Sequence, residues 1–182
     1  MLSAWRSPNA VTTANAALLC GRFDIGAPIY PGADAPLLRP RGPSPVHVHG
    51  QDGLGDIAPD RSRSAPVASR PAAAAIVDQI NTASDKLRIL ALGPLTNLAL
   101  ALDIDPSIAE KVGDVVIMGG AFGWFGRRGN VTPFAEANIH NDPEAAAQLK
   151  RCAAAPRMLC RLVLQAGRLA AQAAEAGPGR SS

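Results

Sequence analysis

Residues 114–144 constrain the fold of this 182-residue chain more than any other stretch. They begin with the continuous apolar run Val115–Met118, which is typical of a strand covered on both faces. The run ends at Gly119-Gly120 and leads into a long polar loop. Residues 141–144 then predict the start of a helix, because they supply a capping side chain, a proline and a first-turn acid. Open α/β sheets place their ligand sites where a strand leads into a helix through such a loop.

Strands and helices alternate through the rest of the sequence. Apolar runs predict strands at residues 28–30, 87–92 and 115–118, and helical patterns cover residues 12–20, 71–81 and 96–102. Residues 36–56 are predicted to be a loop. Alternation of the two patterns over residues 72–149 indicates βαβ units with right-handed crossovers. The expected fold is therefore α/β, with an open, mostly parallel, Rossmann-like sheet flanked by helices.

Composition argues against several classes of function. The net charge is +3 and the arginines are scattered without interleaved aromatic residues, so nucleic-acid binding is not expected. No apolar run is long enough to span a membrane. The cysteines Cys20, Cys152 and Cys160 lack CxxC spacing, which argues against a zinc site or a disulfide framework. A cytoplasmic protein with a small-molecule ligand is the expectation.

The sequence changes character after Gln148. Residues 150–182 are rich in alanine and arginine and contain no further strand-and-helix pattern. A helix is predicted from about residue 157 to residue 176. We therefore divide the chain into a domain of residues 1–149 and a tail of residues 150–182. Our hypothesis is that this tail is not the native continuation of the domain.

Four sequence blocks in residues 1–149 resemble the inosine-uridine-preferring nucleoside hydrolase family. They occur in the family order over about residues 11–149, and each short block alone would be weak evidence. The blocks are residues 28–39 (PIYPGADAPLLR), residues 47–54 (HVHGQDGL), residues 90–100 (LALGPLTNLAL) and residues 116–146, which contain VIMGG, GN, EAN and NDPEAA. The last block is the most specific of the four.

This resemblance implies an activity and a set of site residues. Such enzymes hydrolyse the N-glycosidic bond of ribonucleosides to ribose and a free base, and they are homo-oligomers. A Ca²⁺ ion holds the ribose hydroxyls and a water molecule. By position, the residues that match the family's ribose-binding residues are Met118, Asn130, Glu136 and Asn138. Thr96 matches a residue whose backbone carbonyl binds calcium, and His49 matches a histidine near the base.

The chain departs from the family pattern at the metal site. The family's N-terminal D-x-D-x-x-x-D-D cluster, which supplies the general base and most calcium carboxylates, has no counterpart here. The nearest lookalike, Asp103-Ile-Asp105, follows a different element and is interpreted as a surface turn. The family's distal His-Asp pair is also missing, because no histidine follows His140. We therefore expect a domain that is incomplete relative to the family, without the carboxylate ligands for calcium.

The ribose-binding candidates also have structural interpretations. Asn130 and Asn138 belong to a residue type that commonly caps turns. Glu136 alone would most often be a solvated loop acid, and Met118 alone would most often be a core residue. If residues 47–49 formed a strand, His47 and His49 would share one face and could form a metal pair, but no third ligand accompanies them. A loop with one functional histidine is the favoured interpretation.

Three functional hypotheses follow from these observations. The first is a ribonucleoside hydrolase that belongs to the family in both descent and activity. The second is a truncated and catalytically inactive copy of such an enzyme. The third is a module that binds nucleosides or ribose without turnover. Calcium affinity and turnover of a nucleoside analogue separate the three.

Overall fold

The computed structural model describes residues 8–121, 128–153 and 160–163. Its helices are α1 (Pro8–Arg22), α2 (Val46–His49), α3 (Ala72–Thr82), α4 (Thr96–Ile104), α5 (Ile108–Lys111), α6 (Ala137–Asn141) and α7 (Pro143–Ala153). Its strands are β1 (Ile89–Ala91), β2 (Val115–Met118) and β3 (Cys160–Val163). No helix within the described ranges is long and apolar enough to cross a membrane.

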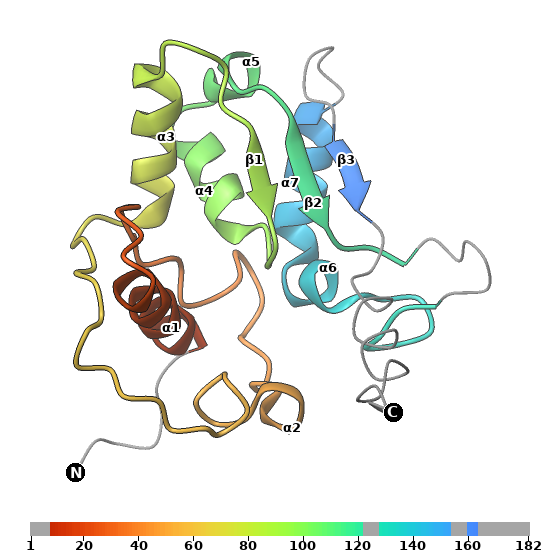
Figure 1. Cartoon of the computed structure of the whole chain (residues 1–182). Helices are drawn as coiled ribbons and strands as arrows, with labels where there is room; N and C mark the ends of the chain where they lie inside the picture. The colour runs from red at the N-terminus through yellow and green to blue at the C-terminus, as the bar shows by residue number, and fades with distance from the viewer. Residues whose placement is uncertain (1–7, 122–127, 154–159, 164–182) are drawn as a thin grey trace, which may run out of the picture.

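The strands form one parallel sheet in the order β1-β2-β3. Leu90 of β1 lies beside Val116 of β2, and Ile117 of β2 lies beside Leu162 of β3. Helices α4 and α5 connect β1 to β2, and α7 precedes β3, so both parallel connections carry helices. β1 and β2 point toward the end of the sheet where α6 lies (Figure 1). The α/β class, the parallel sheet and the helices predicted at residues 71–81 and 96–102 are confirmed.

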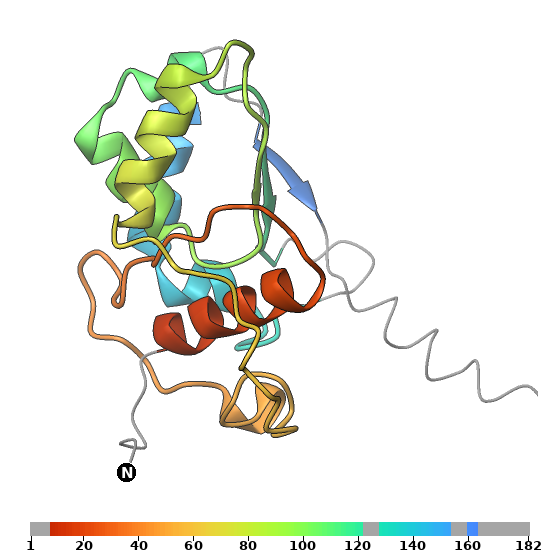
Figure 2. The same ribbon diagram turned by 60° about the vertical axis from the view of Figure 1, so that its left-hand side comes forward.

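The helices α3, α4 and α7 lie together on one face of the sheet (Figure 2). Val115 and Ile117 of β2 are buried on this face and join Leu102 and Leu149 in the core. The opposite face carries Leu90, which is 62% exposed. The apolar run of β2 predicted a strand covered on both faces. Within the part of the chain that the structure describes, only one face is covered by helices.

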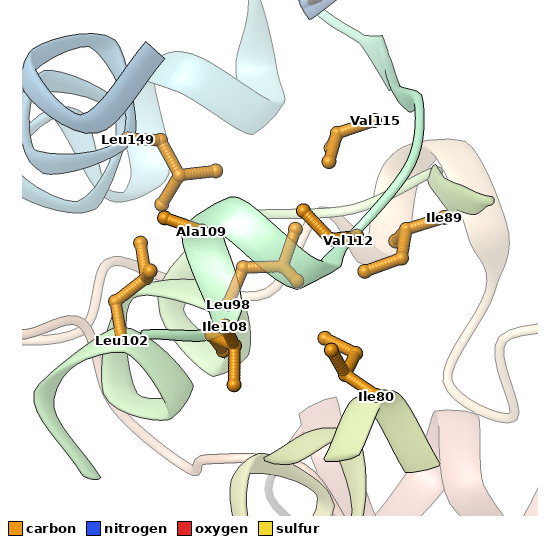
Figure 3. Close-up of a pocket in the computed structure, with 9 residues that line it drawn as sticks. All are labelled: Ile80, Ile89, Leu98, Leu102, Ile108, Ala109, Val112, Val115 and Leu149. Atoms are coloured by element: carbon orange, nitrogen blue, oxygen red, sulfur yellow. The ribbon is translucent and has the colours of Figure 1, made fainter. Parts of the chain in front are cut away.

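A small apolar cavity lies between the helices and the sheet, whose strands contribute Ile89 and Val115 to its lining (Figure 3). Its volume is about 20 Å³, and its lining includes Ile80 of α3, Leu102 of α4 and Leu149 of α7. The volume would hold about one water molecule, but the aliphatic lining offers that water no hydrogen-bond partner. The cavity is therefore a packing gap of the core rather than a ligand site.

The prediction of a helix over residues 157–176 is wrong at residues 160–163, the part of this range that the structure describes. Residues 160–163 form strand β3, which pairs with the open edge of β2. Pairing satisfies the backbone groups of β2 that face this edge, and that gain overrides the helical composition of the segment. Residues 154–159 and 164–176 lie outside the described ranges. α7 runs through residue 149 without interruption, and the proposed division of the chain there stays a prediction.

Three loop segments also differ from the prediction. The strand expected at residues 28–30 is a single bridge between Ile29 and Val67. The loop expected at residues 36–56 contains the short helix α2. Part of the polar loop after β2 is the helix α6, which includes Asn138 and His140. The bridge at Ile29 and the hydrogen bonds of Asn138 to Leu92 and Met118 join segments that are far apart in the sequence, and local sequence patterns do not report such contacts.

The Asp103-Ile-Asp105 lookalike lies at the end of α4, and Asp105 forms a hydrogen-bonded turn. Its carboxylate accepts hydrogen bonds from the Asn81 amide at 2.8 Å and from the Ser107 hydroxyl at 2.6 Å. The hydrogen bond from Asn81, followed by those from Ser107, lowers the pKa of Asp105 to about 2. The Asp105 side chain therefore stabilises the turn after α4.

We predict that the Asp105 carboxyl group titrates near pH 2 in the folded chain. Its ordinary pKa is about 3.9, so its contribution to stability is complete above that pH and is lost as the pH falls toward 2. The Asn81→Ala variant should raise the pKa toward the ordinary value, because the largest cause of the shift is removed. A ¹³C NMR titration of the carboxyl carbon measures both values. An unchanged pKa in this variant would contradict the assignment, and Asn130→Ala is the control.

Candidate active site

The candidate site lies at the carboxyl end of β2, where Met118 is followed by Gly119 and Gly120. Gly120 has a φ of 90°, a conformation that favours glycine. A Cβ atom at Gly119 would lie 3.1 Å from the Glu136 carboxylate, so this turn passes close against that side chain. The double glycine therefore lets the chain leave β2 directly beside Glu136.

Glu136 is a buried carboxylate that accepts three backbone hydrogen bonds. It is 3% exposed, and its oxygens accept from the amides of Gly120 at 3.1 Å, Asn138 at 2.9 Å and Ile139 at 3.2 Å. It caps the N-terminus of α6 and ties this helix to the turn after β2. The interpretation of Glu136 as a solvated loop acid is therefore wrong.

Asn138 joins the ends of two neighbouring strands. Its amide nitrogen donates to the carbonyl of Met118 at 2.9 Å and to the carbonyl of Leu92, just after β1, at 3.2 Å. The same nitrogen lies 3.1 Å from the sulfur of Met118. Only the NH₂ group can donate hydrogen bonds to two carbonyl oxygens, and this fixes the orientation of the amide. The Asn138 side-chain carbonyl is thus the atom that can accept a hydrogen bond from a ligand hydroxyl.

Asn130 reaches the same site from the loop before α6. Its side-chain oxygen accepts a hydrogen bond from the amide of Ala137 at 2.9 Å, at the first residue of that helix. The structure therefore brings Asn130, Glu136, Asn138 and Met118 together around the N-terminus of α6 and the end of β2. These are the four residues predicted to bind ribose.

Thr96 lies at the start of α4, and its hydroxyl donates a 2.6 Å hydrogen bond to the carboxylate of Asp142. Asp142 is fully buried and also accepts from the amides of Leu37 at 3.0 Å and Ala145 at 3.0 Å. It therefore holds the starts of α4 and α7 and one loop together. Sequence reasoning predicted only a helix start here; an aspartate directly before a helix-opening proline was the available signal.

The loop that begins at Pro31 is fixed from two further directions. The side chain of Asn9 accepts from the amide of Gly32 and donates to its carbonyl, at 3.1 and 2.6 Å. The side chain of Asn97, next to Thr96, accepts from the amide of Ala33 at 2.8 Å. Residues 28–39, the first family-like block, are therefore pinned beside the start of α4.

His49 is not brought to this cluster by any hydrogen bond of the described residues. It lies on the short helix α2 with an exposed side chain. His47 is on the same helix, and two residues at this spacing do not face each other on a helix. The two histidines therefore do not share the face that a strand would have given them. A role of His49 near a base stays a prediction.

The described residues do not fit a calcium site. They contain no group of three or more His, Cys, Asp or Glu side chains that could hold a metal ion. Both carboxylates near the cluster, Glu136 and Asp142, are already engaged by backbone and hydroxyl donors. Ca²⁺ takes six to eight oxygen ligands, usually with several carboxylates. No step of the chemistry is therefore assigned to a metal here.

Comparison with known proteins identifies the family. The sequence model of the inosine-uridine preferring nucleoside hydrolases matches residues 6–176. The chain belongs to this nucleoside hydrolase family. The probable uridine nucleosidase 2 of Oryza sativa subsp. japonica is 45% identical over 138 residues, which are 74% of this chain and 39% of that protein. The non-specific ribonucleoside hydrolase RihC of Salmonella agona is 43% identical over 141 residues, which are 77% of this chain and 44% of that protein.

Solved structures agree with this family assignment. A plant nucleoside hydrolase, the PpNRh1 enzyme, superposes with a TM-score of 0.73 and 38% sequence identity. An inosine-guanosine nucleoside hydrolase superposes with a TM-score of 0.75 and 29% identity. The two superpositions cover 90% and 91% of this nucleoside hydrolase chain but only 49% and 50% of the solved chains. This chain therefore spans about half the length of its solved relatives and about two fifths of the curated ones, at 39% and 44%.

Proposed function

We propose that this chain acts in the hydrolysis of the N-glycosidic bond of ribonucleosides and supplies the sugar-binding half of the site. One observation carries the proposal. Glu136 hydrogen-bonds Gly120, 16 residues earlier, and Asn138 hydrogen-bonds Met118 and Leu92, 20 and 46 residues earlier, so these groups meet at the carboxyl ends of β1 and β2. Ligands of open α/β sheets bind at this edge. Release of ribose and a free base suits a role in nucleoside salvage.

Each polar group of the cluster has a defined part in binding the sugar. The side-chain carbonyl of Asn138 accepts a hydrogen bond from a ribose hydroxyl, while its NH₂ group remains hydrogen-bonded to the carbonyls of Leu92 and Met118. Asn130 is exposed and offers its NH₂ group as a donor, since its oxygen is held by Ala137. The carboxylate of Glu136 holds the α6 backbone in place and places negative charge near a sugar that becomes cation-like in the reaction.

A second candidate function is nucleoside binding without turnover. The observation that favours it is the lack of a metal-binding carboxylate group among the described residues. Without an activated water, a bound nucleoside keeps its glycosidic bond. Two measurements on the 182-residue chain separate the candidates: saturation-transfer NMR with uridine for binding, and p-nitrophenyl riboside cleavage with a calcium titration for turnover. Uridine is the first ligand to test because plant relatives from Oryza sativa and Arabidopsis thaliana carry the name uridine nucleosidase.

Turnover above the buffer blank would support hydrolysis by the chain itself. Binding without turnover would support the second candidate and assign catalysis to groups outside the described residues. If neither uridine nor inosine binds, the sugar-binding role is wrong.

We predict that Asn138→Ala weakens uridine binding. The variant deletes the acceptor offered to the sugar and releases the carbonyls of Leu92 and Met118. Loss of a hydrogen-bond group in a sugar site costs roughly 1–3 kcal/mol, or about 5- to 150-fold in affinity. Asn81→Ala is the matched control, because Asn81 bonds Asp105 and Lys111 rather than any residue of the cluster. Equal binding by the two variants would contradict the assignment of Asn138.

A further inference from the structure

Phe134 is a large aromatic side chain that the fold leaves 90% exposed, in the loop between Asn130 and Glu136. Single exposed apolar side chains are common on protein surfaces and need no explanation by themselves. Phe134 differs from such residues in its position, because residues of the candidate site lie at both ends of its loop. The loop runs beside α6, at the end of the sheet to which β1 and β2 point (Figure 1).

Hydrogen bonds fix the backbone at the tip of this loop. Residues 132–135 form a β-turn, in which the carbonyl of Thr132 accepts from the amide of Ala135 at 3.2 Å. Pro133 occupies the second position of the turn, where its ring sets the φ angle that the turn needs. The Thr132 hydroxyl also accepts from the amide of Phe134 at 3.2 Å. The exposed ring of Phe134 is therefore carried by a hydrogen-bonded turn.

The base of the loop is closed against the candidate site. The amide of Val131 donates to the carbonyl of Ala135 at 3.1 Å, and the side-chain oxygen of Asn130 accepts from the amide of Ala137 at 2.9 Å. A Cβ atom at Gly129 would clash with the carbonyl of Ala135, so glycine allows the two sides of the loop to close. The tip of the loop is thus held close to the residues proposed to bind the sugar.

Phe134 is within reach of a nucleoside that this cluster holds. Two residues of extended chain span at most about 7 Å, which limits the distance between the Cα atoms of Phe134 and Glu136. The base of a nucleoside is bonded directly to its sugar, so a ribose held by Asn130 and Asn138 carries its base beside them. Small-molecule sites combine a few polar groups with aromatic side chains. The cluster supplies the polar groups, and Phe134 supplies an aromatic ring two residues from Glu136.

We propose that the ring of Phe134 stacks on the base of the bound ribonucleoside and thereby favours ligands with a planar base over the sugar alone. This inference rests on the proposed function, because the cluster must hold the sugar for the ring to meet the base. Every base has an aromatic face, so stacking accepts purines and pyrimidines alike. The role of Phe134 is therefore to select ribonucleosides as a class rather than one particular base.

The test compares inosine with methyl β-D-ribofuranoside, in which a methoxy group replaces the base. NMR titration gives the dissociation constants for the 182-residue chain and its variants. We expect Phe134→Ala to weaken inosine binding about 5- to 150-fold, the size of a lost base–aromatic stack, and to leave binding of the methyl riboside unchanged. Phe134→Trp should restore inosine binding, because indole keeps an aromatic face. Phe23→Ala is the matched control, since Phe23 is 65% exposed and directly follows α1.

A second measurement detects the contact itself. In the chain labelled with ¹³C-phenylalanine, we expect nuclear Overhauser effects between the ring protons of Phe134 and the base protons of inosine. The signals that disappear in Phe134→Ala identify this ring among those of the four phenylalanines. Circular dichroism verifies that each variant is folded. Absence of these effects in the inosine-saturated chain would overturn the inference.

The affinities can overturn the inference in other ways. An unchanged affinity of Phe134→Ala for inosine would do so, and so would equal losses for inosine and the methyl riboside, because the effect would then lie in the sugar. An equal loss in Phe23→Ala would do so as well. If the parent chain binds the methyl riboside as tightly as inosine, the base gains nothing from the ring, and this inference alone fails. If the parent chain binds neither ligand, the proposed function fails and the inference fails with it.

Discussion

Replacement of Asp142 with alanine should lower the free energy of unfolding by about 4 kcal/mol. Asp142 is 0% exposed, and its carboxylate accepts hydrogen bonds from the Thr96 hydroxyl and from the amides of Leu37 and Ala145. The variant leaves these donors without an acceptor in the interior and removes the cap of α7. Domains of this kind are stable by only about 5–15 kcal/mol, so the loss is a large part of the total. Urea denaturation followed by circular dichroism measures it.

Three further variants define the expected order of effects. Asp142→Asn keeps one acceptor oxygen but places an NH₂ group opposite other donors. This variant should therefore lower the free energy of unfolding by about 2 kcal/mol. Thr96→Val removes a single hydrogen bond and should cost about 1 kcal/mol. Asp85→Ala, at an exposed position, should change stability by less than about 0.5 kcal/mol. A loss for Asp142→Ala no larger than that for Asp85→Ala would show that the buried carboxylate does not hold the three segments together.

The regular elements around β2 were predictable because their signals are local. The run Val115–Met118 is apolar throughout, and it forms β2 with the predicted bounds. The helix that starts at Pro143 follows an aspartate whose carboxylate accepts from the amide of Ala145. Capping and periodicity act over a few residues, so the sequence alone reports them.

The hydrogen bonds that build the site were not predictable from local patterns. Asn138 and Leu92 are 46 residues apart, and so are Thr96 and Asp142. Family resemblance named Asn138 and Thr96, but it did not indicate that one bridges two strand ends or that the other is held by a buried carboxylate. Such roles depend on which strands are neighbours, a property of the tertiary fold.

Strand β3 is an element that the local sequence pattern predicted wrongly. Residues 160–163 lie in an alanine- and arginine-rich segment whose composition favours a helix. Each of these residues instead pairs with a residue of β2, from Val115 to Met118. Helix propensity does not predict this pairing, because it is a weak preference that tertiary contacts override.

Replacement of Glu136 with glutamine should lower the free energy of unfolding by about 2 kcal/mol, although the two side chains have nearly the same shape. The carboxylate accepts three backbone hydrogen bonds, two on Oε2 from Gly120 and Ile139 and one on Oε1 from Asn138. Glutamine replaces one of these oxygens with an NH₂ group, which then faces a backbone N–H donor. At least one amide is left without an acceptor in a site that is 3% exposed.

The change should be concentrated at the start of α6. This helix has five residues, too few to persist without its cap and its packing, so the amides of Asn138 and Ile139 should lose protection against hydrogen exchange. Uridine binding should fall with them, because Asn138 then no longer holds its place between Leu92 and Met118. Glu110→Gln, at an exposed position of α5, is the matched control and should leave both quantities unchanged. If Glu136→Gln retains the exchange protection and the melting curve of the parent chain, the carboxylate is not the group that fixes this turn, and its burial beside Gly119 and Gly120 needs another cause.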